Sequence, residues 1–178
     1  MVECSPDSGS RMIDRNCKCH MIIEDQEISN RYGAAVKATC RVLASTDPSQ
    51  VGKVLSEFFE CEGNAVGKFY NLCEATGLIT AEQRKESQEA KVGLSIDETL
   101  LKGRQFCAEV IMKPNMRKNP ATGEREINPE KPGPYPELGF QSFALTSPKA
   151  KGIPIDPLAG AKSAAPDEPS VAGEDMGW

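Results

Sequence analysis

The chain has 178 residues, of which 39% are hydrophobic and 26% charged, and its net charge is −5 at pH 7. This hydrophobic content supports one domain core but not two sizeable ones. The sequence contains neither the run of roughly 18 apolar residues that spans a membrane nor the apolar segment of a secretory signal. We therefore expect a soluble, cytoplasmic protein, and the negative charge argues against a uniformly basic nucleic-acid-binding protein.

Three strands are predicted in the first third of the chain. Apolar residues alternate with polar ones over 17–28 and over 35–43, which is the period of half-buried strands. The turn-rich segment STDPSQVG follows, and 53–63 is then predicted as a third strand that completes a hairpin.

A change of period next predicts two helices. In segment 64–77, one helical face carries the apolar residues Val66, Phe69, Tyr70 and Cys73. Segment 80–90 begins with a capping box of Thr80 and Gln83 but has almost no apolar stripe, so it is predicted as a solvated or frayed surface helix.

Alternation returns over 101–114 and 138–146, which predicts a fourth and a fifth strand. Between them, the segment from Pro114 to Pro136 holds six of the thirteen prolines and the turn signal NPATGE, so it is predicted as a long loop or a protruding hairpin. Beyond Pro148 the chain is rich in Pro, Gly, Ala and Ser, as in a flexible tail.

Five short strands with one good helix between the third and the fourth is the element order of an OB-fold. We therefore predict a mainly β protein, an OB-fold-like five-stranded Greek-key barrel with a disordered acidic C-terminal tail. The predicted organisation is a flexible segment over 1–15, an OB-like nucleic-acid-binding domain over 16–148, and a flexible linker with an acidic, partner-binding tail over 149–178.

The sequence offers little for catalysis. Its one histidine, His20, is expected to be a surface side chain of a strand, and the scattered cysteines are expected to be reduced thiols in a reducing compartment. Cys17, Cys19 and His20, with Cys4, offer a zinc site as an alternative, but a strand turns His20 away from the two cysteines and no CxxC pair exists. We expect no enzyme activity, no cofactor and no metal.

Basic residues give a stronger signal. Five bases stand against one acid between Lys102 and Lys118, and this run leads into the loop before the fifth strand, which in OB-folds flanks the oligonucleotide-binding face. The bases expected at a single-stranded DNA interface are Lys37, Arg41, Lys53, Lys102, Arg104, Lys113, Arg117 and Lys118.

Binding of a single strand also needs flat side chains on which bases stack. The aromatic candidates are Tyr32, Phe59, Phe106, Tyr135, Phe140 and Phe143. Because a small barrel needs most of its phenylalanines for its core, the two tyrosines near predicted loops, Tyr32 and Tyr135, are the expected stacking residues.

The tail has features of a partner-binding segment. It holds four acids and no base after Ala164, and it ends in the only tryptophan of the chain. The residues predicted to bind a partner are Glu174, Asp175, Met176 and Trp178. Carboxylates next to an apolar end suit a pocket with a basic rim.

Over about 18–148, the segments GKFYNLCEATGLIT and LLKGRQFCAEVIMKP resemble a family of phage single-stranded DNA-binding proteins that accompany recombination and annealing genes. The tail separately resembles the acidic tails of bacterial single-stranded DNA-binding proteins, although these usually end in Ile-Pro-Phe rather than MGW. The resemblance implies a non-enzymatic protein in the host cytoplasm that coats single-stranded DNA in phage replication or recombination. It also implies recruitment of a recombination or replication protein by the tail, and leaves self-association open.

The alternative is a protein-interaction or structural module of a phage without nucleic-acid binding. It fits the negative net charge and the 6% aromatic content. The two hypotheses differ in whether the basic residues of strands two to four converge on one groove; if they scatter around the barrel, the alternative is favoured. These residues are Lys37, Arg41, Lys53, Lys102, Arg104 and Lys113.

Overall fold

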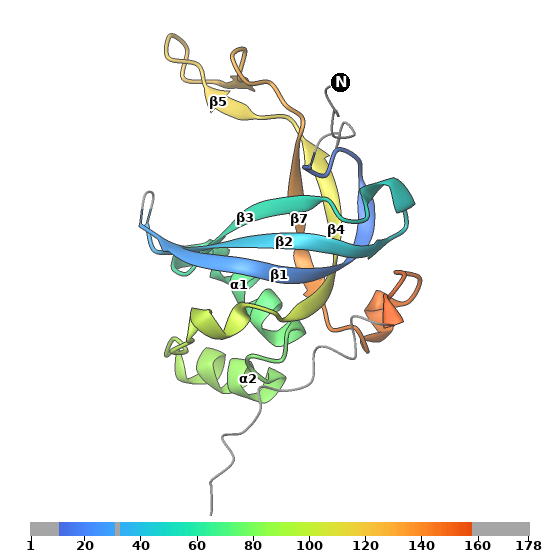
Figure 1. The fold of residues 1–178 in the computed structure, drawn as a ribbon. Coiled ribbons are helices and arrows are strands. Elements are labelled where there is room, and N and C mark those ends of the chain that lie inside the picture. Colours follow the sequence, from blue (N-terminus) through green and yellow to red (C-terminus); the bar gives the residue numbers. More distant parts are fainter. Residues whose placement is uncertain (1–10, 31–32, 158–178) are drawn as a thin grey trace, which may run out of the picture.

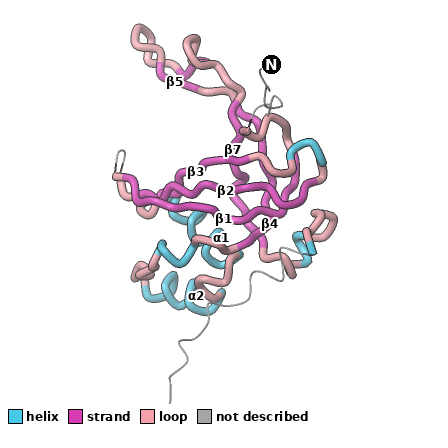
Figure 2. The backbone as a smooth tube through the Cα atoms, viewed as in Figure 1, coloured by secondary structure: helices cyan, strands magenta, loops and turns pink. Residues whose placement is uncertain are grey.

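The computed structural model of the protein describes residues 11–30 and 33–157, which form a curved five-stranded antiparallel sheet with two helices at one end (Figures 1 and 2). The strands are β1 (Cys17–Ser29), β2 (Ala35–Ser45), β3 (Val54–Glu60), β4 (Gln105–Lys113) and β7 (Tyr135–Phe143). Their order in the sheet is β3-β2-β1-β4-β7. The predicted mainly β fold is confirmed, and each predicted strand segment overlaps one of these strands, although β7 begins at Tyr135, before the predicted start at 138.

Two helices connect β3 to β4, namely α1 (Val66–Ala75) and α2 (Ala81–Ala90). The buried residues of α1 are Phe69, Asn71, Leu72, Cys73 and Ala75. The predicted capping box opens α2, because Thr80 Oγ1 accepts a hydrogen bond from the Gln83 amide at 3.1 Å and Gln83 Oε1 accepts one from the Thr80 amide at 2.9 Å. None of the residues of α2 is buried. In the part of the chain that the structure describes, no helix is long and apolar enough to cross a membrane.

The inner face of the sheet and α1 enclose the main hydrophobic core. Period-two alternation turns one set of side chains of β2 and β4 into this core, because successive residues of a strand face opposite sides. Phe59 and Phe106 are only 1% and 0% exposed and are part of it. These two candidates for base stacking are therefore core residues.

The edge strands β3 and β7 are bridged through the Glu57 carboxylate, which also pairs with Lys68 of α1, rather than by a strand ladder. Glu57 of β3 accepts a hydrogen bond from Lys68 Nζ of α1 at 3.1 Å and a second from the Leu138 amide of β7 at 2.8 Å. The two charged side chains are only 12% and 16% exposed. Burial raises the pKa of the Glu57 carboxyl, and the nearby Lys68 ammonium opposes that rise.

We expect Lys68→Met to lower the free energy of unfolding by about 3 kcal/mol at neutral pH, because Glu57 keeps its charge in a buried place without its partner. The loss should shrink at lower pH. A carboxyl whose folded-state pKa lies above its unfolded value, near 4.5, favours folding when protonated, and this contribution disappears as the pH rises through the folded-state pKa. Denaturant unfolding of both proteins at about pH 5 and pH 8 measures the difference.

Adding Glu57→Gln to Lys68→Met is the matched control, because the amide oxygen still accepts from the Leu138 amide and carries no charge. This double variant should recover most of the lost stability at pH 8. An equal loss at both pH values in Lys68→Met would contradict a role for the buried charge.

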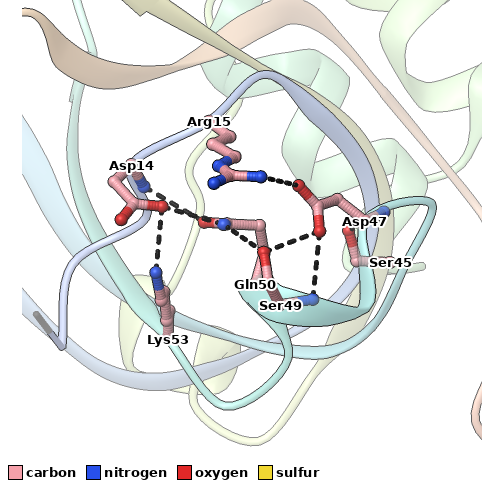
Figure 3. Close-up of polar contacts among 7 residues, drawn as sticks. All are labelled: Asp14, Arg15, Ser45, Asp47, Ser49, Gln50 and Lys53. Carbon is pink, nitrogen blue, oxygen red and sulfur yellow. Dashed lines mark hydrogen bonds and ion pairs between the residues drawn. The ribbon is translucent and has the colours of Figure 1, made fainter. Parts of the chain in front are cut away.

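Residues 11–15, the described part of the segment predicted to be flexible over 1–15, pack against the sheet before β1 begins. Ile13 is buried, and its amide donates to the Val54 carbonyl at 3.1 Å. Next to it, the buried Gln50 accepts from the Asp14 amide at 3.1 Å and donates to Asp14 Oδ1 at 2.8 Å (Figure 3). Because these bonds need Asp14 in place, the folded domain includes residues upstream of 16.

The C-terminal boundary at 148 is also wrong, because the chain covers the outer face of β1 and β4 beyond that point. Ala150 and Ile153 are buried there against Cys107. Beneath the same segment lies His20, whose Nδ1 accepts from the Asp156 amide at 3.1 Å and whose Nε2 lies 2.8 Å from Gln105 Oε1. His20 is thus fully buried rather than a surface side chain, and burial lowers its pKa.

The proline-rich segment between β4 and β7 forms a protruding hairpin, one of the two conformations predicted for it. Its strands β5 (Met116–Lys118) and β6 (Arg125–Ile127) form a separate two-stranded sheet that extends away from the five-stranded sheet (Figure 1). Asn115 ties the base of the hairpin together, because its amide donates to the Pro132 carbonyl at 3.0 Å and its side chain to the Lys131 carbonyl at 2.9 Å. We call residues 114–134 the arm.

Candidate nucleic-acid interface

A groove of about 680 Å³ lies where β3, the start of β7 and the base of the arm meet. The residues that line it are Ser56, Glu57, Phe58, Lys113, Pro114, Asn115, Met116, Arg125, Tyr135, Pro136 and Glu137. Of the residues expected at a DNA interface, Lys113 and Tyr135 line the groove. Phe58, Met116 and Arg125 also line the groove, and they were not among the site residues predicted from the sequence.

Three large side chains remain exposed in this groove. Phe58 is 53% exposed, Tyr135 42% and Met116 40%. Phe58 faces outward because Leu55 and Phe59 of the same strand fill the core and the side-chain direction alternates. Exposed large apolar side chains that gather in one groove, rather than scatter singly, mark a binding surface.

Tyr135 is held at the rim of the groove by the turn that precedes it. Gly133 has a φ of 80°, a conformation that favours glycine. A Cβ at Gly133 would lie 3.0 Å from the backbone nitrogen of Tyr135 and 3.1 Å from its ring. The absence of a side chain there thus permits the close approach of the tyrosine.

One face of the arm carries cations without anions. In the β5–β6 ladder, Met116 is opposite Ile127 and Lys118 is opposite Arg125. Lys118 and Arg125 have no ion pair with any of the described residues. Like charges directly opposite each other destabilise a sheet, so an anion from outside that contacted both cations would relieve this repulsion.

Lys113 at the groove and Arg117 on the arm have acidic partners, whereas Lys131 of the arm has no ion pair with a described residue. Lys113 Nζ donates to Glu137 Oε1 at 2.9 Å, and Arg117 Nε donates to Glu126 Oε1 at 2.9 Å on the opposite face of the arm. Both pairs are at least one-third exposed, so each contributes less than about 1 kcal/mol. Lys113 at the groove can therefore exchange Glu137 for a phosphate at low cost.

The predicted bases of β2 are also paired. Lys37 Nζ donates to Glu27 of β1 at 3.0 Å, and the Arg41 guanidinium makes a two-pronged ion pair with Glu24. The hydrogen bonds with Glu24 raise the pKa of Arg41. Lys37 lies opposite Phe58 in the β2–β3 ladder and so borders the groove, whereas Arg41 lies at the far end of β3, opposite Val54.

Three further predicted basic residues lie away from the groove and contact other groups of the protein. Lys53 donates to Asp14 at 2.9 Å in the cluster that anchors the N-terminal segment (Figure 3). Arg104 donates to the carbonyls of Leu100 and Thr76 at 2.8 and 2.9 Å. Lys102 lies 4.0 Å from Asp25. The six bases that separate the two hypotheses thus do not converge on one groove, which by itself favours the protein-interaction alternative.

The remaining predicted residues lie away from the groove or outside the described residues. Phe140 is exposed on β7, where its ring lies against Gly67 of α1, and Phe143 is half-buried beneath the C-terminal segment. Tyr32 lies outside the described residues, as do the predicted tail residues, which are Glu174, Asp175, Met176 and Trp178.

The alternative zinc site is not assembled among the described residues, and Cys4 lies outside them. The sulfur atoms of Cys17 and Cys19 lie 3.2 Å apart on the inner face of β1, while His20 faces outward beneath the C-terminal segment. No group of three or more His, Cys, Asp or Glu side chains gathers as metal ligands within 11–30 and 33–157.

Comparison of the chain with protein-family models, with curated proteins and with solved structures finds no match.

Proposed function

We propose that this protein binds single-stranded DNA in the groove between β3 and the arm, and that it acts by binding rather than by catalysis. The observation that carries this proposal is the meeting of exposed Phe58, Tyr135 and Met116 with Lys113 and Arg125 in one groove. Stacking of bases on aromatic rings contributes about 1 to 3 kcal/mol per base, while cations neutralise phosphates.

The acids of the groove are compatible with a polyanion. Glu57 is neutralised by Lys68, and Glu137 by Lys113, so the floor of the groove carries little net charge. Lys118 and Arg125, which lie opposite each other on the arm, have no ion pair with the described residues. We therefore propose that the nucleobases of the DNA stack against Phe58 and Tyr135 and that its phosphates lie along the arm.

We further propose that the sheet is an OB-fold-type barrel. The order β3-β2-β1-β4-β7, with α1 between β3 and β4, supports this assignment. In OB-folds, the face of the second and third strands binds oligonucleotides between the loops that connect strands one to two and four to five. The corresponding segments here are 30–34 and the arm, and Phe58 lies on the β3 face beside the arm.

Its expected role is that of the phage single-stranded DNA-binding proteins that the sequence resembles. The protein would coat DNA strands during phage replication or recombination in the host cytoplasm. The tail, through the acids and Trp178, would recruit a recombination or replication protein.

The second candidate function is a protein-interaction module, and the ion pairing of Lys37, Arg41 and Lys53 favours it. An apolar groove with a mixed-charge rim also suits a peptide. The two functions differ in the effect of salt, since only a polyanion releases many counterions when it is bound.

Fluorescence anisotropy with labelled oligo-dT and a matching duplex, titrated with the full-length chain at two salt concentrations, tests the proposal. We expect preference for the single strand and an affinity that falls steeply with salt. Absence of binding to both probes at low salt would contradict the proposal and leave the protein-interaction function.

A further inference from the structure

Cys17 and Cys19 form a pair of touching thiols at the beginning of β1. Their sulfur atoms are 3.2 Å apart, and the Cys19 sulfur lies 3.5 Å from Ser45 Oγ. The six cysteines within the described residues are free. A Cys-X-Cys pair on one face of a strand brings two thiols together because side chains two residues apart point the same way.

Both thiols are buried, but Cys17 lies nearer to solvent than Cys19. Cys17 is 7% exposed and is among the residues that line an open cavity of about 410 Å³, while Cys19 is fully buried. We therefore expect a small oxidant that enters the fold to reach Cys17 before Cys19.

The thiols also differ in acidity. The hydrogen bond from Cys19 lowers the pKa of Cys17 to about 7, although burial and the carboxylates of Asp47 and Asp14 act in the opposite direction. The pKa of Cys19 is raised by that same bond and by burial. Burial also raises the pKa of the Cys40 thiol to about 12 and that of Cys107 to about 11. Because the thiolate is the reactive form, Cys17 is distinguished from these buried cysteines.

We propose that Cys17 and Cys19 are a reversible dithiol–disulfide site that hydrogen peroxide oxidises. The Cys17 thiolate attacks one peroxide oxygen, the O–O bond breaks, and the leaving oxygen takes up a proton to become water, which leaves a sulfenic acid on Cys17. The Cys19 sulfur then attacks the Cys17 sulfur. The S–S bond forms, the S–O bond breaks, and the hydroxide combines with the Cys19 proton as a second water.

The geometry of the pair favours a disulfide that is readily reduced back to two thiols. Two residues along a strand span about 6.6 Å between their Cα atoms, which is near the upper end of the range that disulfides tolerate. A disulfide at that limit is easily reduced, as are the labile, regulatory disulfides of other proteins. Two thiols oxidised to one disulfide give up two electrons, and the peroxide that accepts them becomes two waters.

Trypsin provides a direct test, because Lys18 stands between the two cysteines. The reduced full-length protein is treated with one equivalent of hydrogen peroxide, its free thiols are blocked, and it is digested without reductant. We expect mass spectrometry to show the peptide 16–18 joined to the peptide 19–31, released by a thiol reductant. The rate should rise as the pH increases through about 7. Blocked thiols at both positions while other cysteines are oxidised would overturn the proposal.

Variants test the order of the two steps. In Cys19→Ser, oxidation should stop at the sulfenic acid of Cys17, which a dimedone reagent traps, whereas Cys107→Ser should form the disulfide as the wild type does. A sulfenic acid trapped at Cys107 but not at Cys17 would contradict the assignment. If Cys19→Ser does not fold, the wild-type peptide map alone decides.

Discussion

Phe58→Ala is expected to weaken binding of oligo-dT by about five- to 150-fold, which corresponds to the loss of about 1 to 3 kcal/mol of stacking on one ring. The ring is 53% exposed and lines the groove, so its removal should change the free energy of unfolding by about 1 kcal/mol or less. Anisotropy titration and denaturant unfolding of the same preparation measure the two effects.

The neighbouring residue serves as the control, because Phe59→Ala removes a ring of the same size from the core. Phe59 is 1% exposed and packs against Phe69 at 6.3 Å between ring centroids. We expect it to lower the free energy of unfolding by about 3 to 5 kcal/mol. If Phe58→Ala left the affinity unchanged, the groove would not be a stacking platform.

Reversal of the two facing, unpaired cations of the arm, in Lys118→Glu with Arg125→Glu, should produce the other large loss of affinity. Each phosphate contact contributes about 0.7 to the slope of log affinity against log salt for single strands. The double variant should therefore bind much more weakly at low salt and show a slope reduced by about 1.4 if both side chains contact phosphate. Titrations of oligo-dT at several salt concentrations give both quantities.

A matched control places the same change of charge at α2, in Lys85→Glu with Lys91→Glu. Lys85 is exposed on α2, and the exposed Lys91 follows the helix as its C-cap residue. This control should reduce affinity far less, because screening limits charge effects to about 10 Å at 0.1 M salt. Equal losses in both double variants would mean that overall charge, rather than the arm, governs binding.

The strands and both helices could be predicted from the sequence because each carries its pattern locally. Residues 35–43 alternate cleanly, since β2 has one face in the core and the other outside. The capping box of Thr80 and Gln83 identified the start of α2 in the same way. Such patterns depend only on residues that are close in the sequence and not on contacts with distant segments.

The candidate site depended on contacts between distant segments, and the sequence showed only part of it. The ladder sets Lys37 beside Glu27, and a bulge near Glu24 brings that acid to Arg41, so bases that appear free in the sequence are paired. The opposite position of Lys118 and Arg125 likewise appears only in the register of the arm.

Phe58 shows how adjacent residues of one type can have different roles. The sequence gives two consecutive phenylalanines, and the phase of β3 relative to Leu55 decides which of them is inside. Strict alternation from Leu55 would have identified Phe58 as the exposed ring. The burial of His20, in contrast, depends on a segment more than a hundred residues away and has no local signal.

The most direct test of the central claim is to photocrosslink oligo-dT to the full-length chain with ultraviolet light and to identify the attached residues by mass spectrometry. The account predicts crosslinks at Phe58, Tyr135 and Met116, the large exposed side chains of the groove. Crosslinks that avoid β3 and the arm and lie on α2 or beside Lys53 instead would contradict it.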